Sequence, residues 1–140
     1  MTIILQPKCK IDDLKNLTIE IANCMQKTIY DLFEIRLDIK EPNDLILNGK
    51  KISGILTEIN TIGDKINYLL ISIGFNVNEE FFSDDLKDIA TSLKKEFDKY
   101  FSREEIIVSF IRNLEITLKE NESFLYIQIR QKCSKRYRKQ

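Results

Sequence analysis

Side chains suited to holding an anion gather between residues 40 and 78. Asn43 and Asp44 follow Pro42, whose fixed φ angle restrains the turn, so their side chains are held at a strand end instead of moving freely. An amide and a carboxylate held in this way can contact a nucleotide or its Mg²⁺. Ordinary turn chemistry also explains a Pro-Asn-Asp sequence, because these residue types dominate turns.

Two adjacent lysines follow the Asn48-Gly49 pair. Successive side chains of a strand point to opposite faces, so only one of Lys50 and Lys51 can face a site on the sheet, and the other is expected in solvent. An ammonium group beside an α-phosphate would stabilise the charge that builds up when a carboxylate attacks ATP, without any proton transfer by the protein. A solvated surface lysine after a turn is the alternative interpretation.

Two glycines, Gly54 and Gly74, each interrupt an otherwise apolar strand. Glycine within a strand indicates a close approach of backbone or ligand, and a β-bulge explains either glycine equally well.

Hydrophobic spacing predicts the elements that must position these side chains. A β-branched run at residues 2–6, ended by Pro7, predicts a strand. Apolar residues at helical spacing predict a long amphipathic helix over residues 11–33, with Asp12 and Asp13 near its start. The Asn48-Gly49 pair predicts a tight hairpin turn. Further strands are expected at residues 36–39, 45–47, 51–59 and 66–73.

Beyond residue 78 the pattern changes to an acidic loop and then to a helix at residues 103–119 with Ser102 as its N-cap. Residues 122–137 are expected to be helical and to end in a basic tail. The predicted fold class is α+β, with an antiparallel or mixed sheet and helices packed on one face. We expect one domain over residues 1–125 and a basic C-terminal helix or tail over residues 126–140.

The composition indicates a single globular domain of 140 residues, of which 43% are hydrophobic and 31% charged. Basic and acidic residues number 22 each, so the net charge of zero predicts no binding to nucleic acid or to an anionic membrane. No apolar run approaches the roughly 20 residues that span a bilayer, and no secretion signal is apparent. We therefore expect a cytoplasmic protein.

Cysteine spacing and the absence of histidine exclude several catalytic classes. Cys9, Cys24 and Cys133 stand far apart without a Cys-x-x-Cys motif, so we expect reduced, mostly buried thiols and no dedicated zinc site. Without histidine, the Ser-His and Cys-His systems of hydrolases lack their usual base.

The order of these motifs resembles the central block of biotin protein ligases. It runs Lys-x-Pro-Asn-Asp from residue 40, Lys-Lys at 50 and 51, Gly-Ile-Leu-x-Glu from 54, and Ile-Gly-x-Asn-Val-Asn from 73. Residues 2–7 are similar to the strand that follows the family's glycine- and arginine-rich loop, and residues 90–93 (ATSL) match a further family segment. The resemblance implies a biotin/lipoate ligase-like catalytic domain.

The resemblance also implies a reaction and its residues. Biotin and ATP would form biotinoyl-adenylate and pyrophosphate, and the biotinoyl group would pass to a lysine of a biotin carboxyl carrier protein. Lys51 would be the catalytic lysine that contacts the biotin carboxylate and the α-phosphate. The remaining site residues would bind the nucleotide with its Mg²⁺ (Asn43, Asp44 and Asn76) or biotin (Gly54, Leu56 and Phe75).

The chain departs from the family pattern in several places. In the family, the glycine- and arginine-rich loop precedes the strand that residues 2–7 resemble, and this sequence does not contain that loop. We therefore expect a truncated catalytic domain that needs an N-terminal ligase half or a homodimer partner. Glu41 stands where tryptophan is usual and Ser72 where glycine is usual, both near the expected biotin pocket. The basic residues 132–139 replace a small C-terminal barrel domain, and we assign them no nucleic-acid role.

Three functions remain open from the sequence. The first is biotin–protein ligase activity, completed by the missing N-terminal half. The second is a catalytically inactive ligase remnant that acts as a binding or interaction module. A lipoate ligase-like acyl transfer is the third, although it predicts a different turn from Pro-Asn-Asp. The unpaired edge beside residues 2–6 further predicts a partner strand or poor solubility.

Overall fold

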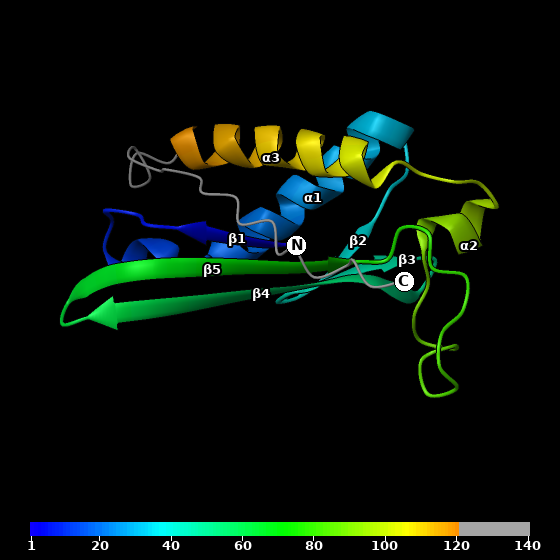
Figure 1. The fold of residues 1–140 in the computed structure, drawn as a ribbon, viewed down its shortest axis with the longest axis horizontal. Helices are drawn as coiled ribbons and strands as arrows, with labels where there is room; N and C mark the ends of the chain where they lie inside the picture. Colours follow the sequence, from blue (N-terminus) through cyan, green and yellow to red (C-terminus); the bar gives the residue numbers. More distant parts are fainter. Residues whose placement is uncertain (121–140) are drawn as a thin grey trace, which may run out of the picture.

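The computed structural model describes residues 1–120, which form one antiparallel sheet with helices on one side (Figure 1). The strands lie in the order β1-β5-β4-β3-β2, and every neighbouring pair is antiparallel. The predicted α+β fold class is confirmed, with an antiparallel and not a mixed sheet over the described residues. The strands are Thr2–Leu5 (β1), Asp38–Lys40 (β2), Asp44–Leu47 (β3), Lys50–Ile62 (β4) and Lys65–Phe75 (β5).

Some predictions fall outside the described residues. These are the helix at residues 122–137, the basic tail at 126–140 and the thiol of Cys133. The domain boundary placed at residue 125 therefore stays a prediction.

The long N-terminal helix begins later than its sequence pattern indicates. Ile11–Leu14 form a separate 3₁₀-helix (η1), and α1 spans Leu17–Phe33. The Asp13 carboxylate accepts a hydrogen bond from the Lys10 backbone N–H at 2.9 Å, so this acidic residue caps the 3₁₀ turn and not α1. The predicted single helix is therefore correct over its main part and wrong over its first turn.

Turn residues define the hairpin between β3 and β4. Asn48 and Gly49 adopt φ angles of 50° and 78°, the left-handed conformation that tight hairpin turns require. Leu47 pairs with Lys50 directly across this turn. The hairpin prediction is confirmed, and both lysines lie at the start of β4.

Two helices complete the described chain. The short α2, Leu93–Phe97, was not expected from the sequence; its N-cap Ser92 accepts a hydrogen bond from the Lys95 backbone N–H at 3.0 Å. The last helix, α3, spans Arg103–Glu120. Ser102 Oγ accepts a hydrogen bond from the Glu105 N–H at 3.1 Å, which confirms the predicted N-cap.

The sheet has one buried face and one open face because its side chains alternate. On β5, Leu69, Ile71 and Ile73 are at most 5% exposed and join the core. The intervening Ser72 is half-buried and Gly74 is exposed. Helices α1 and α3 both lie on the buried side, with α3 packed on α1 (Figure 1). Side chains in the Ser72 and Gly74 register thus point away from the helices.

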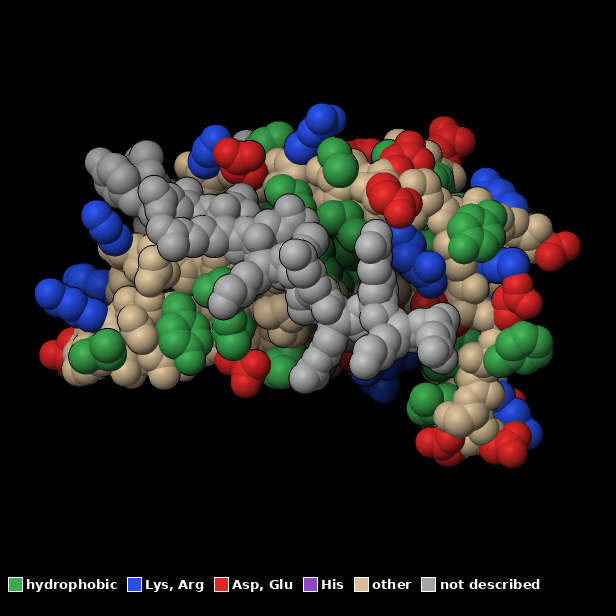
Figure 2. Space-filling model, in the orientation of Figure 1, with side chains coloured by type: hydrophobic (Ala, Val, Ile, Leu, Met, Phe, Trp, Pro, Cys, Tyr) green, Lys and Arg blue, Asp and Glu red, His purple; other side chains and the backbone are tan. Residues whose placement is uncertain are grey.

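The acidic loop predicted after residue 78 projects from the body beside α2. Figure 2 shows hydrophobic side chains interleaved with acidic ones on this projection. Phe81 is 90% exposed and Ile89 is 60% exposed. The loop is therefore a mixed apolar and acidic surface.

The two cysteines within residues 1–120 are free thiols, as expected. Cys24 is buried, and this burial raises the pKa of its thiol to about 11. Cys9 is half-buried, and its pKa is also raised, chiefly by burial. Both thiols are thus protonated near neutral pH and poor nucleophiles.

None of the helices within residues 1–120 has the length and apolar character that crossing a bilayer requires. The cytoplasmic location stays a prediction.

The contact between α1 and α3 gives a test of the core. Phe110 on α3 is fully buried, and its carbonyl lies 3.9 Å from Cys24 Sγ on α1. We expect Phe110→Ala to lower the free energy of unfolding by about 3–5 kcal/mol, because it removes a large buried ring and leaves a cavity. Val108→Ala, at an exposed position of the same helix, should change it by less than about 0.5 kcal/mol. Urea denaturation measures both, and similar values would contradict this packing.

Candidate functional site

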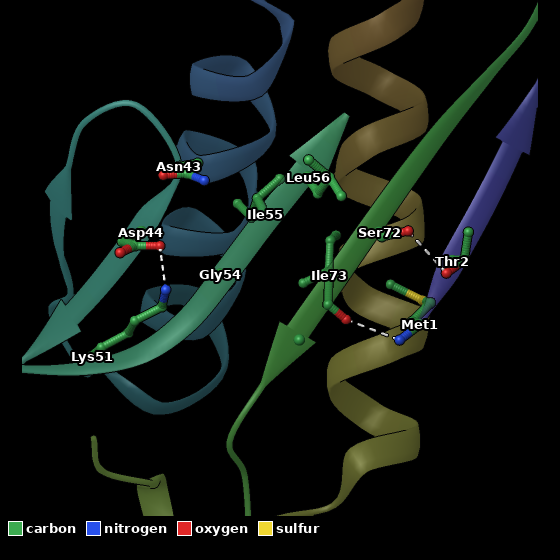
Figure 3. A pocket seen from close by; sticks show the side chains of 11 residues that line it. Met1, Thr2, Asn43, Asp44, Lys51, Gly54, Ile55, Leu56, Ser72 and Ile73 are labelled. Carbon is green, nitrogen blue, oxygen red and sulfur yellow. Dashed lines mark hydrogen bonds and ion pairs between the residues drawn. The ribbon is translucent and has the colours of Figure 1, made fainter. Parts of the chain in front are cut away.

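A cavity of about 380 Å³ lies on the open face of the sheet (Figure 3). Its floor follows the register of the strands: Asp44 of β3 pairs with Gly54 of β4, and Gly54 pairs with Gly74 of β5. Because neither glycine carries a Cβ, the centre of the floor is bare backbone. The lining residues are Met1, Thr2, Asn43, Asp44, Lys51, Gly54, Ile55, Leu56, Ser72, Ile73 and Gly74.

An ion pair forms one wall of this cavity. Lys51 Nζ lies 2.8 Å from Asp44 Oδ1, and the two side chains reach toward each other from adjacent strands (Figure 3). Apart from this contact, the buried Oδ1 atom has no hydrogen-bond partner among the described residues. The side chain of Lys51 is 49% exposed, so its ammonium group remains open to the cavity.

A β-bulge decides which face Lys51 occupies. The pairing between β3 and β4 shifts so that Ile46 faces Lys51 while Leu45 faces Ser53. The intervening Ile52 and Ser53 are both buried, so the alternation of faces is interrupted between Lys51 and Gly54. Lys51 therefore shares the cavity face with Gly54. Lys50 does not line the cavity, which agrees with the expected divergence of the two lysines.

The cavity brings together most of the residues predicted from the sequence. Asn43, Asp44, Lys51, Gly54 and Leu56 all line it, and Leu56 supplies an apolar side chain that is 54% exposed.

Phe75 and Asn76, by contrast, are not among the lining residues. Asn76 is held by backbone: its Nδ2 donates to the Thr91 carbonyl at 3.1 Å, and its N–H donates to the Ile52 carbonyl at 2.9 Å. Their predicted contacts with biotin and the nucleotide stay predictions.

Other lining residues were not predicted as site residues, although Ser72 was expected near the biotin pocket. Thr2 and Ser72 meet across the β1–β5 pair, with their hydroxyl oxygens 3.1 Å apart. Met1 exchanges backbone hydrogen bonds with Ile73 at 2.9 and 2.8 Å. Strand alternation could have predicted Ser72, because it lies two residues from Gly74 and so points to the same face of the sheet. It also pairs with Leu56 of β4.

Residues 89–91, distant in sequence, form hydrogen bonds with the backbone of Lys51. The Lys51 N–H donates to the Ile89 carbonyl at 2.8 Å, and the Thr91 N–H donates to the Lys51 carbonyl at 2.9 Å. Residues 89–91 thus run parallel to the start of β4.

Glu96 of α2 then ties this segment to the hairpin turn. Its carboxylate accepts hydrogen bonds from Thr91 Oγ1 at 2.5 Å and from Asn48 Nδ2 at 2.7 Å. These bonds, the Thr91 bond first, lower the pKa of Glu96 below its usual value. Sequence reasoning missed this group, because no spacing connects Asn48 with Glu96.

A second hollow, of about 550 Å³, lies between the later part of α1 and residues 36–38. Its lining mixes both charges and includes Lys27, Asp31, Arg36 and Asp38. None of the residues predicted to act in the site lies there. The sequence motifs therefore select the cavity on the open face.

Comparison with known proteins identifies the class. Residues 1–78, more than half of the chain, match the biotin/lipoate A/B protein ligase family. The chain is 39% identical over 109 residues to the bifunctional ligase/repressor BirA of Bacillus subtilis, covering 76% of this chain and 34% of the relative.

Solved structures agree with this assignment. The apo biotin protein ligase from Aquifex aeolicus superposes with a TM-score of 0.70 at 29% identity, over 82% of this chain and 51% of the other. The same ligase in complex with biotin and ATP gives a TM-score of 0.67 at 25% identity, over 85% and 50%. The protein therefore belongs to the biotin/lipoate A/B protein ligase family and is similar to its biotin protein ligases. It spans about a third of the length of the BirA relative and about half of the Aquifex enzyme.

The two floor glycines give a test of the cavity geometry. A Cβ at Gly54 would lie 3.3 Å from Lys51 Cε and 3.6 Å from Asp44 Oδ1, whereas a Cβ at Gly74 would meet nothing within 4 Å. We expect Gly54→Ala to displace the Lys51 side chain, seen as a shift of its Cε–Hε signals in NMR. Gly74→Ala should leave those signals in place and raise the free energy of unfolding by about 0.5 kcal/mol. Equal shifts in both variants would contradict the arrangement.

The lowered pKa of Glu96 predicts a pH dependence of stability. Its carboxylate bonds stabilise the fold above the ordinary glutamate pKa of 4.5, and this stabilisation is lost as the pH falls through the lower folded-state pKa. Between about pH 5 and pH 3, the free energy of unfolding should therefore fall more steeply for the wild type than for Glu96→Gln. Urea titrations at each pH measure this, with the exposed-site variant Glu58→Gln as control. Parallel curves for wild type and Glu96→Gln would refute the prediction.

Proposed function

We propose that this chain carries part of the active site of a biotin protein ligase. In the first step, a biotin carboxylate oxygen attacks the α-phosphorus of ATP, forming biotinoyl-adenylate and releasing pyrophosphate. In the second, the amine of a carrier-protein lysine attacks the acyl carbon, an amide forms, and AMP leaves. The observation that supports this most is the Lys51 ammonium group, held over a glycine-floored cavity.

Lys51 would contribute electrostatic stabilisation. A half-exposed ion pair such as Lys51–Asp44 contributes only about 0–1 kcal/mol, so an incoming anion can compete for the ammonium group. The competing groups would be the biotin carboxylate and the α-phosphate, whose negative charge increases in the transition state.

The floor and walls suit the rest of the ligand. Gly54 and Gly74 leave room for a ring against the backbone, and Leu56 offers apolar surface to the valeryl chain. Phe75 ends β5 and Asn76 follows it, next to Gly74, and both are assigned to the adjoining parts of the biotin and nucleotide sites.

Mg²⁺ would enter together with ATP. Magnesium is usually held by one or two carboxylates plus substrate phosphates. Within residues 1–120 no group of three or more acidic or cysteine side chains stands ready to hold a metal ion. The solvent-shielded Asp44 oxygen fits such a shared site, with the Asn43 amide beside it.

We further propose that a partner completes the site. Among residues 1–120, Lys51 is the only lysine or arginine that lines the cavity, and the triphosphate of ATP carries more negative charge than one lysine side chain balances. Within residues 1–120, β1 is an edge strand of the sheet, and its outer edge offers a place for an additional strand from an N-terminal ligase half or a second copy. The final acceptor would be a biotin carboxyl carrier protein.

The alternative is a non-catalytic module that binds biotin, nucleotide or carrier protein. The neutralisation of Lys51 by Asp44 favours it. Purified chain, alone and with an N-terminal ligase half, should be incubated with biotin, MgATP and carrier protein while pyrophosphate and biotinylated lysine are measured. Product in either mixture supports the ligase, and binding of biotin or ATP without product in both supports the module.

The two lysines provide a matched pair of variants. Because Lys51 lines the cavity and Lys50 does not, Lys51→Ala should lower the rate of pyrophosphate release by about 10²–10³-fold. Lys50→Ala should lower it by less than about threefold. Single-turnover assays with labelled ATP measure both rates. Equal losses would mean that Lys51 has no special role in the chemistry.

A further inference from the structure

The backbone of Lys51 is held by chain that lies outside the β3–β4 hairpin. Both its N–H and its carbonyl are bonded to residues 89–91, at 2.8 and 2.9 Å. Because a lysine side chain has many rotatable bonds, the position of its ammonium group depends on how firmly its own backbone is held. Residues 89–91 therefore act as a brace under Lys51.

This brace is itself anchored on two sides. Asn76 Nδ2, beyond the end of β5, donates to the Thr91 carbonyl at 3.1 Å. On the other side, the Thr91 hydroxyl donates to Glu96 at 2.5 Å. Thr91 is fully buried, so its hydroxyl would be costly to leave without a partner.

Glu96 connects the brace to the turn that precedes Lys51. One carboxylate oxygen accepts from Thr91 and the other from Asn48, whose left-handed φ of 50° forms the hairpin turn. The carboxylate thus bonds both chain segments that flank the start of β4. Bonds to a charged acceptor are stronger than neutral ones, which suits a group that has to hold two segments in register.

We propose that Glu96 is a positioning residue for Lys51, acting through Thr91 and Asn48 and touching no substrate. This inference deepens the proposed function and rests on it for the role of Lys51. Residues 89–96 follow the segment that matches the family model, residues 1–78, and line no part of the cavity themselves.

Hydrogen exchange tests the brace without any need for activity. In Glu96→Ala, the Lys51 and Thr91 amides should exchange roughly tenfold faster, because a charge-assisted bond that orders both segments is lost. Thr91→Val, which keeps the buried shape and removes only the hydroxyl, should give a change in the same direction. Glu96→Gln should restore protection, since an amide can bond the same two groups after the Asn48 amide turns over.

Glu80→Ala is the matched control. Glu80 also binds α2, through an ion pair with Lys94, but it does not contact Thr91 or Asn48. Protection of the Lys51 amide should be unchanged in this variant. Equal protection in wild type, Glu96→Ala and Thr91→Val would overturn the proposal, as would an equal loss in Glu80→Ala.

Kinetics separate positioning from general stability. In the mixture that releases pyrophosphate, Glu96→Ala should lower kcat roughly tenfold with little change in KM for biotin and ATP, and Glu96→Gln should recover most of it. A normal kcat despite lost amide protection would overturn the positioning role. If wild-type chain releases no pyrophosphate in any mixture, the proposed function fails, and the exchange experiment still decides whether Glu96 positions Lys51.

Discussion

The antiparallel pairing of β4 with β5, from Ser53 opposite Phe75 to Ile62 opposite Lys65, holds the rest of the molecule in place. Its alternation sends Ile71 and Ile73 into the core under the helices and leaves Ser72 and Gly74 on the open face. The other strands and the cavity are arranged around this ladder. A shift of one residue would bury the cavity floor and expose the core.

A weak ion pair stands at the centre of the proposed chemistry. The Lys51 and Asp44 side chains are 49% and 22% exposed, which limits their mutual stabilisation to about 0–1 kcal/mol. The pair therefore matters more for geometry than for stability. It keeps an ammonium group at the cavity wall while leaving it available to a stronger anion, and it keeps a shielded carboxylate oxygen beside the same space.

The family-model match and the backbone support of Lys51 fall on different segments of the chain. The match to biotin/lipoate A/B protein ligases covers residues 1–78, which contain the whole sheet and every lining residue of the cavity. Residues 89–96 lie outside that match, yet they bond the backbone of Lys51 and the turn before it. The helical layer also extends beyond the match, because α3 covers α1 and supplies Phe110 to the core. The later part of the chain thus stabilises the sheet that carries the candidate site.

Local patterns in the sequence determined much of this structure. Hydrophobic alternation and the Asn48-Gly49 pair specify the strands and their hairpin, since both depend on residues close in the chain. The order of the motifs was enough to predict five residues that line one cavity: Asn43, Asp44, Lys51, Gly54 and Leu56. Three features followed only from the tertiary structure. A bulge places Lys51 on the same face as Gly54, and the Asn76 side chain donates to a backbone carbonyl. The third is the hydrogen bond between Glu96 and Asn48. Each of these depends on contacts between strands or between distant segments, and no residue spacing encodes such contacts.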